Sequence, residues 1–179
     1  MALRKAASYS KMYARPYTRK SKVKAKSYIK TIPPQNIVKF FMGNRVAYET
    51  KKLPIILRLI SREQIQIRDN ALEASRQFIN KQLETKFGNQ FYFMVKVVPH
   101  HILRENKMLT GAGADRMQTG MALSFGKAMG RAALVPAGKE IFVVALETEK
   151  AASEVRRMFE QIKSKLPGKT RIGSERLTK

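Results

Sequence analysis

Residues 133–166 read ALVPAGKEIFVVALETEKAASEVRRMFEQIKSKL, two apolar β-rich runs joined by a turn and followed by a helical pattern. The Pro-Ala-Gly-Lys turn at 136–139 predicts a β-hairpin between 133–135 and 140–146. Thr148 is placed to cap the next helix, whose apolar stripe recurs every three or four residues: Ala152, Val155, Phe159, Ile162 and Leu166. This stretch therefore indicates a domain that combines antiparallel strands with amphipathic helices.

The sequence before this stretch adds more elements of both kinds. A second helical pattern begins after Ser61 and stops at Gly88. Ile67, Ala71, Ala74 and Phe78 fall at helical spacing, and the adjoining row is Leu72, Ser75, Ile79 and Leu83. Strands are predicted at 37–42 (closed by Gly43-Asn44), 53–60 and 91–98. Because strands and helices do not alternate regularly, we expect an α+β fold, a single compact domain with a mainly antiparallel sheet and two main helices.

One long segment shows no periodicity. Residues 99–130, PHHILRENKMLTGAGADRMQTGMALSFGKAMG, are predicted to form a Gly-rich loop, and loops of this length are usually functional or disordered. We therefore divide the chain into a basic N-terminal arm (1–34), a globular domain that includes the loop (35–166) and a basic C-terminal tail (167–179).

Charge identifies the class of partner. The 179 residues hold 36 Lys and Arg against 13 Asp and Glu, a net charge of +23, far above the magnitude of about 2–8 suited to a small soluble domain. No cysteine is present, which excludes disulfides, Cys-ligated metals and thiol catalysis. No apolar run approaches the roughly 20 residues of a membrane span, so no membrane partner is expected. The composition predicts a nucleic-acid partner.

The N-terminal arm concentrates this charge. Residues 1–30 contain ten Lys and Arg, no acid, and tyrosines at 9, 13, 17 and 28 whose rings suit stacking on bases. We expect the arm to become ordered only on its partner. A mitochondrial transit peptide has a similar composition, but the Lys-rich stretch, Pro16 and the basic body favour a binding arm; a solubilising tail is the other alternative.

Four chemistries are conceivable for the predicted loop. A metal site is disfavoured because His100 and His101 are adjacent and the acids are scattered. No phosphate-binding or dinucleotide glycine motif is present, and Glu105 and Asp115 each have a neighbouring arginine with which to pair. Two interpretations remain: a loop that contacts nucleic acid, with no enzymatic activity, cofactor, metal or small-molecule substrate, and a disordered surface insertion.

Several segments carry a family resemblance. Five segments resemble, in order, the large-subunit ribosomal protein family called ten-e in archaea and eukaryotes and sixteen in bacteria: RPYTRK (15–20), FFMGN (40–44), QIRDNALEASR (66–76), VKVVPHHILRENKMLTGAGADRMQTGM (95–121) and the predicted PAGKEIFVVAL hairpin with its following helix (136–166). The resemblance covers nearly the whole chain. The sequence departs from the family pattern at 21–30, which affects the path of the arm, and at 122–134, which affects the contacts made directly after the loop.

The resemblance implies a β-hammerhead-like α+β fold and a structural role in translation. The family lies between helices of the large rRNA, beside the groove for aminoacyl-tRNA, and joins the subunit late in assembly. Its loop reaches toward the peptidyl-transferase centre, where the chemistry belongs to RNA. The implied partners are large-subunit rRNA, tRNA in the aminoacyl site and neighbouring ribosomal proteins, and the implied location is cytoplasmic and ribosome-bound.

Transferred to this sequence, the resemblance gives two sets of site residues. The rRNA-binding set is Arg4, Lys5, Lys11, Arg15, Tyr17, Arg19, Lys20, Lys22, Lys24 and Lys26. The loop set near tRNA and the peptidyl-transferase centre is His101, Arg104, Asn106, Lys107, Met108, Gly111, Gly113, Arg116 and Gln118. The alternative is an architectural protein that coats DNA or RNA without sequence preference; an RNA-modifying enzyme would show a cofactor motif or an acid–base set.

Overall fold

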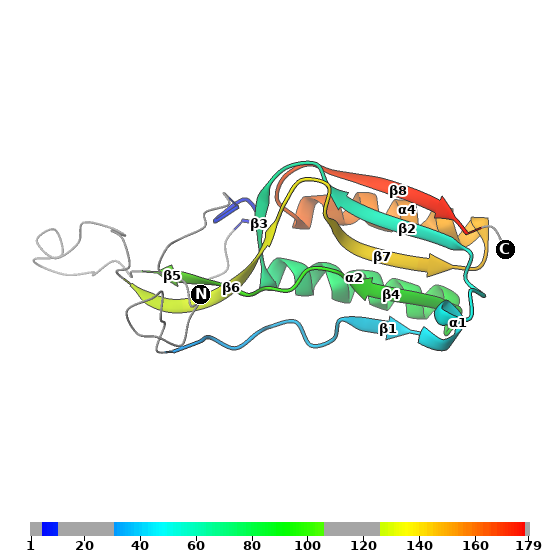
Figure 1. Cartoon of the computed structure of the whole chain (residues 1–179), viewed down its shortest axis with the longest axis horizontal. Helices are drawn as coiled ribbons and strands as arrows, with labels where there is room; N and C mark the ends of the chain where they lie inside the picture. The colour runs from blue at the N-terminus through cyan, green and yellow to red at the C-terminus, as the bar shows by residue number, and fades with distance from the viewer. Residues whose placement is uncertain (1–4, 11–30, 106–125, 178–179) are drawn as a thin grey trace, which may run out of the picture.

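Two antiparallel sheets organise the part of the chain that the computed structural model describes, residues 5–10, 31–105 and 126–177 (Figure 1). The larger sheet has the strand order β1 (Phe41–Gly43), β4 (Phe91–Val95), β7 (Glu140–Leu146), β2 (Ile55–Ser61) and β8 (Thr170–Arg176). The smaller sheet has the order β3 (Ile65–Arg68), β6 (Lys127–Val135) and β5 (His101–Glu105). The predicted α+β class is confirmed.

Helices α2 (Asp69–Phe87) and α4 (Glu149–Ile162) cover one face of the larger sheet (Figure 1). Their apolar sides pack with the sheet around fully buried residues such as Leu57, Phe93, Phe142 and Phe159, so helices and strands share one core. A 3-10 turn, η1 (Lys163–Lys165), follows α4. A short helix that the sequence analysis missed, α1 (Arg45–Glu49), is capped by Asn44, whose Oδ1 accepts a hydrogen bond from the Ala47 N–H at 2.9 Å.

The last helix agrees with its prediction. The Thr148 hydroxyl accepts a hydrogen bond from the Ala151 N–H at 3.4 Å and caps α4. All members of the predicted stripe are buried: Ala152, Val155, Phe159, Ile162 and Leu166.

The earlier helix begins later than predicted. Residues 65–68, Ile-Gln-Ile-Arg, form β3 and pair with β6, so Ile67 belongs to a strand. The alternation of apolar and polar residues over these four positions is the strand pattern that the helical interpretation overlooked. Within α2 the buried row is Leu72, Ser75, Ile79 and Leu83. The helix ends as predicted at Gly88, which has φ +56°.

The predicted hairpin at 133–146 is wrong. The turn exists, with the Lys139 N–H donating to the Pro136 carbonyl at 3.2 Å, but within the described chain β6 pairs with β3 and β5 while β7 pairs with β2 and β4. The turn therefore carries the chain from the smaller sheet to the larger one. The turn between β2 and β3 also changes sheet, and Ser61 exchanges backbone hydrogen bonds with Gly138 and Lys139 across the two turns.

Three further segments differ from prediction. The strand predicted at 37–42 is shorter and ends one residue later: β1 comprises only residues 41–43. Both ends of the predicted 99–130 loop are strands, β5 and β6, which pair with each other. Residues 170–176 of the predicted tail form β8, the edge strand beside β2. Backbone pairing with a distant strand decides these segments, because their side chains alone show weak patterns.

Candidate nucleic-acid interface

The described residues include three of the predicted contact residues. Lys5 is exposed, Arg104 is half-buried and His101 is buried with 3% of its surface exposed. The other predicted positions lie outside the described residues: Arg4, Lys11, Arg15, Tyr17, Arg19, Lys20, Lys22, Lys24, Lys26, Asn106, Lys107, Met108, Gly111, Gly113, Arg116 and Gln118.

Part of the N-terminal arm is held by the smaller sheet. The Gln66 N–H donates to the Ser10 carbonyl at 2.8 Å, and its side-chain amide donates to the Tyr9 carbonyl at 2.6 Å. One Arg68 guanidinium nitrogen donates to the Lys5 carbonyl at 3.1 Å. Residues 5–10 are thus fixed on β3, whereas we expected an arm ordered only by its partner. The Lys5 side chain stays exposed.

The same sheet forms the base of the loop. Strand β5 ends at Glu105, β6 begins at Lys127, and these two residues are partners in the register. His101 starts β5, an edge strand of this sheet, and pairs with Ala132 of β6. Its side chain is buried in the fold instead of reaching outward. A register shift between Leu103 and Arg104 interrupts the regular ladder just before the loop. A paired, two-stranded stem therefore flanks residues 106–125, the part of the predicted loop that lies outside the described residues.

The end of the arm and the segment that follows it are also anchored. The Arg131 guanidinium donates to the Pro33 carbonyl at 2.7 Å, which joins β6 to the end of the arm. The Asn36 backbone N–H and side-chain amide donate to the Asp69 carboxylate at 3.3 and 2.9 Å. Burial raises the pKa of Asp69, and the hydrogen bonds from Asn70 and Asn36 oppose that rise. These contacts fix the chain where it enters the body.

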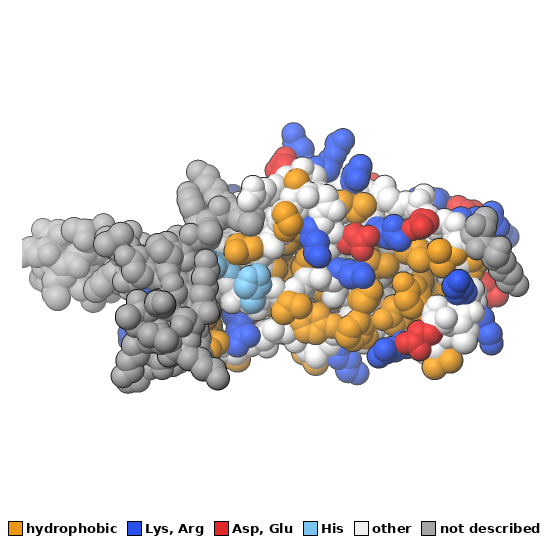
Figure 2. Space-filling model, in the orientation of Figure 1, with side chains coloured by type: hydrophobic (Ala, Val, Ile, Leu, Met, Phe, Trp, Pro, Cys, Tyr) orange, Lys and Arg blue, Asp and Glu red, His pale blue; other side chains and the backbone are white. Residues whose placement is uncertain are grey.

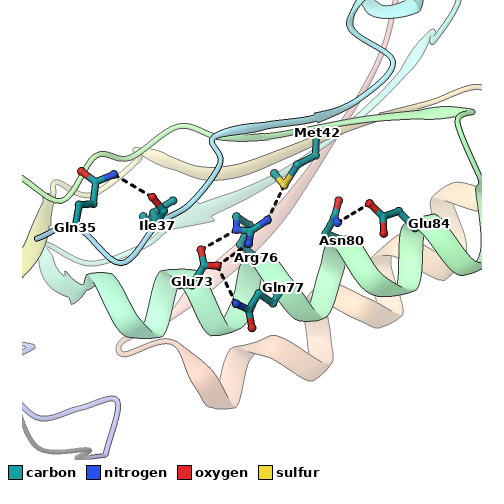
Figure 3. A network of polar contacts seen from close by, with 8 residues as sticks. All are labelled: Gln35, Ile37, Met42, Glu73, Arg76, Gln77, Asn80 and Glu84. Carbon is teal, nitrogen blue, oxygen red and sulfur yellow. Dashed lines mark hydrogen bonds and ion pairs between the residues drawn. The ribbon is translucent and has the colours of Figure 1, made fainter.

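A polar network continues this anchoring along α2 (Figure 3). The Arg76 guanidinium donates to both carboxylate oxygens of Glu73, at 2.7 and 2.5 Å, and to the Met42 sulfur at 3.1 Å. The Gln77 side-chain amide also donates to Glu73, at 2.9 Å. The hydrogen bonds from Arg76 hold the pKa of Glu73 below its usual value. Through Met42 the network links α2 to β1, the strand that follows the anchored segment.

Charge is distributed unevenly over the described body. Helices α2 and α4 each contain three acidic and three basic residues, so the helical layer has no net charge. Ion pairs within this layer include Lys86 with Glu154 at 2.6 Å and Arg157 with Glu154 at 3.2 Å. The excess of cations therefore lies on the turns, the sheet and the N-terminal segments. A polyanion is attracted to those surfaces more strongly than to the helices.

Two kinds of site are not found in the described residues. No group of three or more His, Asp or Glu side chains among them is placed to hold a metal ion. No described helix is both long enough and apolar enough to cross a membrane.

The sequence analysis missed the residues that hold the arm, chiefly Gln66, Arg68 and Arg131. The polar positions of the Ile-Gln-Ile-Arg strand gave a usable signal for the first two, because alternation places them on one face. Arg131 comes directly after the segment that was predicted as loop, and its contact with Pro33 joins positions 98 apart in sequence.

Comparison with known proteins supports the resemblance. The family model described as Ribosomal protein L16p/L10e matches residues 13–173. A large ribosomal subunit protein uL16 from Methanococcus maripaludis is 45% identical over 160 residues, covering 88% of this chain and 87% of the relative. Proteins of the same name from Pyrobaculum arsenaticum and Thermofilum pendens are 42% and 43% identical over 173 residues, covering 96% of this chain and 91% and 96% of the relatives. The chain belongs to the ribosomal protein L16p/L10e family.

Proposed function

We propose that this protein is a structural constituent of the large ribosomal subunit, bound to rRNA in the cytoplasm, that helps position aminoacyl-tRNA near the peptidyl-transferase centre. Family membership and relatives named as large-subunit proteins support the location. The net charge of +23 supports rRNA as the main partner. The role is structural, and it includes contacts with neighbouring ribosomal proteins and a step late in subunit assembly.

The observation that carries the proposal is that one small sheet holds both predicted contact segments. Residues 5–10 of the arm are hydrogen-bonded to β3, and the loop leaves from β5 and β6 of the same sheet. In Figure 1 the N-terminal segment lies beside these strands, at the end of the molecule away from β1 and α1. An arm bound to rRNA would therefore set the position of the loop relative to that RNA.

In this proposal the two segments act differently. The arm cations neutralise rRNA phosphates and release counterions, each contact adding about 0.7–0.9 to the slope of log affinity against log salt. The loop contacts tRNA or rRNA of the catalytic centre through Arg104, Lys107 and Arg116, and its glycines allow close backbone approach.

Replacement of residues 107–125 by a short Gly-Ser turn tests the loop. Because β5 and β6 pair up to Glu105 and Lys127, the stem should persist and the variant should still enter large subunits. We expect slower accommodation of aminoacyl-tRNA, measured by stopped-flow fluorescence, or accumulation of late precursor particles. A second variant keeps the loop length and removes only charge, with Lys107→Gln and Arg116→Gln. Because these cations carry the proposed contacts, it should show the same kind of defect.

Normal accommodation and normal maturation with the shortened loop would contradict this role. Sedimentation addresses the alternative: a protein that coats nucleic acid without preference would be found with DNA as well as ribosomes. The proposal requires that it sediment with large subunits.

A further inference from the structure

Three turns meet where the two sheets join. The turn after β2 is hydrogen-bonded to the turn before β7, through Ser61 N–H to the Lys139 carbonyl at 3.0 Å and Gly138 N–H to the Ser61 carbonyl at 2.8 Å. The same turn receives the segment before β8, because the Arg62 N–H donates to the Lys169 carbonyl at 2.9 Å. The three turns therefore form one backbone-bonded unit.

Each of these turns presents cations to solvent. We define the turn patch as four exposed residues of this unit and the start of β8: Arg62, Lys139, Lys169 and Arg171. Arg171 is paired with Ile60, one residue before Ser61 in β2, so all four lie on neighbouring backbone positions. Figure 2 shows Lys and Arg side chains projecting together along the upper edge of the molecule, over this junction.

The turn patch keeps a charge surplus. None of its four cations forms an ion pair with a residue in the described ranges, in contrast to the paired cations of the helical layer. Glu63 lies beside the patch, and nearby Glu140 is paired with Arg58 at 3.2 Å. Among the acids of the described turns beside the patch, only Glu63 has no ion pair. Four positive charges and this one negative charge give a local net charge of +3.

The backbone of the turn patch is also constrained. Gly168 has φ +74°, and a Cβ at this position would lie 3.0 Å from the Ile65 side chain. Gly138 has φ +80° in its turn. The glycines allow these turn conformations, and the backbone hydrogen bonds join the turns, so the backbone positions that carry the cations are set before any partner binds. This reduces the backbone part of the ordering cost of binding.

We propose that the turn patch is a second RNA-phosphate-binding site, separate from the N-terminal arm and the loop. Exposed cations on joined turns, with no ion pair among the described residues, suit phosphate oxygens, and such contacts set the position of a protein on RNA without reading sequence. This inference rests on the proposed rRNA-binding function and adds to it a specific surface of the folded body.

Lysine footprinting tests the site on the unaltered protein. The full chain is bound to a large-subunit rRNA transcript and treated with an acetylating reagent. Lys139 and Lys169 should be protected several-fold on binding, whereas Lys81 and Lys150 of the helical layer should react as in the free protein. Equal reactivity of the patch lysines with and without bound RNA would overturn the inference, and so would protection that appears only in whole subunits, which would indicate a protein partner.

A matched pair of variants measures how much the turn patch contributes to the salt dependence of RNA binding. The patch variant carries Arg62→Gln, Lys139→Gln, Lys169→Gln and Arg171→Gln; the control carries Lys81→Gln, Lys150→Gln, Arg156→Gln and Arg157→Gln on the helices. We expect the salt slope of the patch variant to be smaller by about 3, from about 0.7–0.9 per phosphate contact, and that of the control to match wild type. A patch slope equal to the control's would refute the site alone. Failure of the wild-type chain to bind the transcript would instead refute the proposed function, and the site with it.

Discussion

Arg76 and Glu73, one turn apart on α2, form a bidentate ion pair at 2.7 and 2.5 Å with both side chains only 10% exposed. Such a pair is usual on a helix surface, but here it is covered by the segment that leads to β1 and also binds the Met42 sulfur. Its location allows it to hold α2 against the chain that follows the arm.

Removal of one partner should destabilise the protein strongly. In Glu73→Gln the Arg76 guanidinium keeps its charge in a site that is largely withdrawn from water, and breaking a buried pair in this way costs about 3 kcal/mol. Urea unfolding followed by circular dichroism measures the change. Arg45→Gln, which breaks the exposed pair with Glu49, is the control and should change stability far less. Equal losses in the two variants would show that burial of the Arg76 pair contributes nothing.

The Glu73–Arg76 pair should also make the stability of the protein depend on pH in the acid range. The pKa of Glu73 is lowered in the folded state from its ordinary 4.5, so its contribution is fully present above that value and is lost as pH falls through the lowered pKa. Glu73→Gln should therefore lose less stability than wild type between about pH 5 and pH 3, where the linkage of a depressed carboxyl acts. Unfolding free energies measured across this range provide the comparison, and parallel curves would argue against the pairing.

Asp69 should show the opposite sign. Burial raises its pKa above the ordinary 3.8, so the folded state binds the proton more tightly than the unfolded chain and stability falls as pH rises through the raised pKa. Asp69→Asn removes this titration, so the unfolding free energy of the variant should decline less than that of wild type just above pH 3.8. The check is the difference in unfolding free energy between variant and wild type over that interval; a difference that grows in the other direction would contradict the burial effect.

Alanine substitutions at two glycines with nearly the same φ distinguish backbone strain from steric crowding by a new methyl group. Gly43 has φ +81°, and a Cβ there would clash with the Phe91 carbonyl oxygen, whereas Gly138 has φ +80° and open space around it. Gly138→Ala should cost only the left-handed backbone penalty of about 1–2 kcal/mol. Gly43→Ala adds displacement of β4 from β1 and should cost clearly more in a denaturant titration. Similar costs would mean that the β1–β4 contact adapts to the methyl group.

The arm anchor can be tested by proteolysis. Gln66→Ala removes the side-chain hydrogen bond to the Tyr9 carbonyl while leaving the backbone bond to Ser10. One hydrogen bond contributes about 1 kcal/mol, which predicts roughly fivefold faster tryptic cleavage after Lys5. Gln77→Ala, which removes an amide from α2, is the control and should leave that cleavage rate unchanged. An unchanged rate in Gln66→Ala would place the anchor elsewhere.

Residue content predicts a basic arm and a glycine-rich segment, because charge and missing periodicity are local properties. It does not predict how the described parts of the candidate site are arranged. The local alternation places Gln66 and Arg68 on one face of a strand, but it does not specify their partner. That Gln66 holds Tyr9 depends on a contact between residues more than 50 positions apart. The turn patch is similar, since Arg62, Lys139 and Lys169 come together only when three turns bond.

The sequence by itself determined the cap and stripe of α4, the end of α2 at Gly88, the mixed α+β class and the cationic character of the molecule. Each depends on side-chain spacing or charge within one segment, where local physics is sufficient. Tertiary structure alone decided that 133–135 and 140–146 enter different sheets, that 65–68 form a strand and that 170–176 pair with β2. Strand pairing satisfies backbone groups with distant partners, so the choice of partner belongs to the folded chain as a whole.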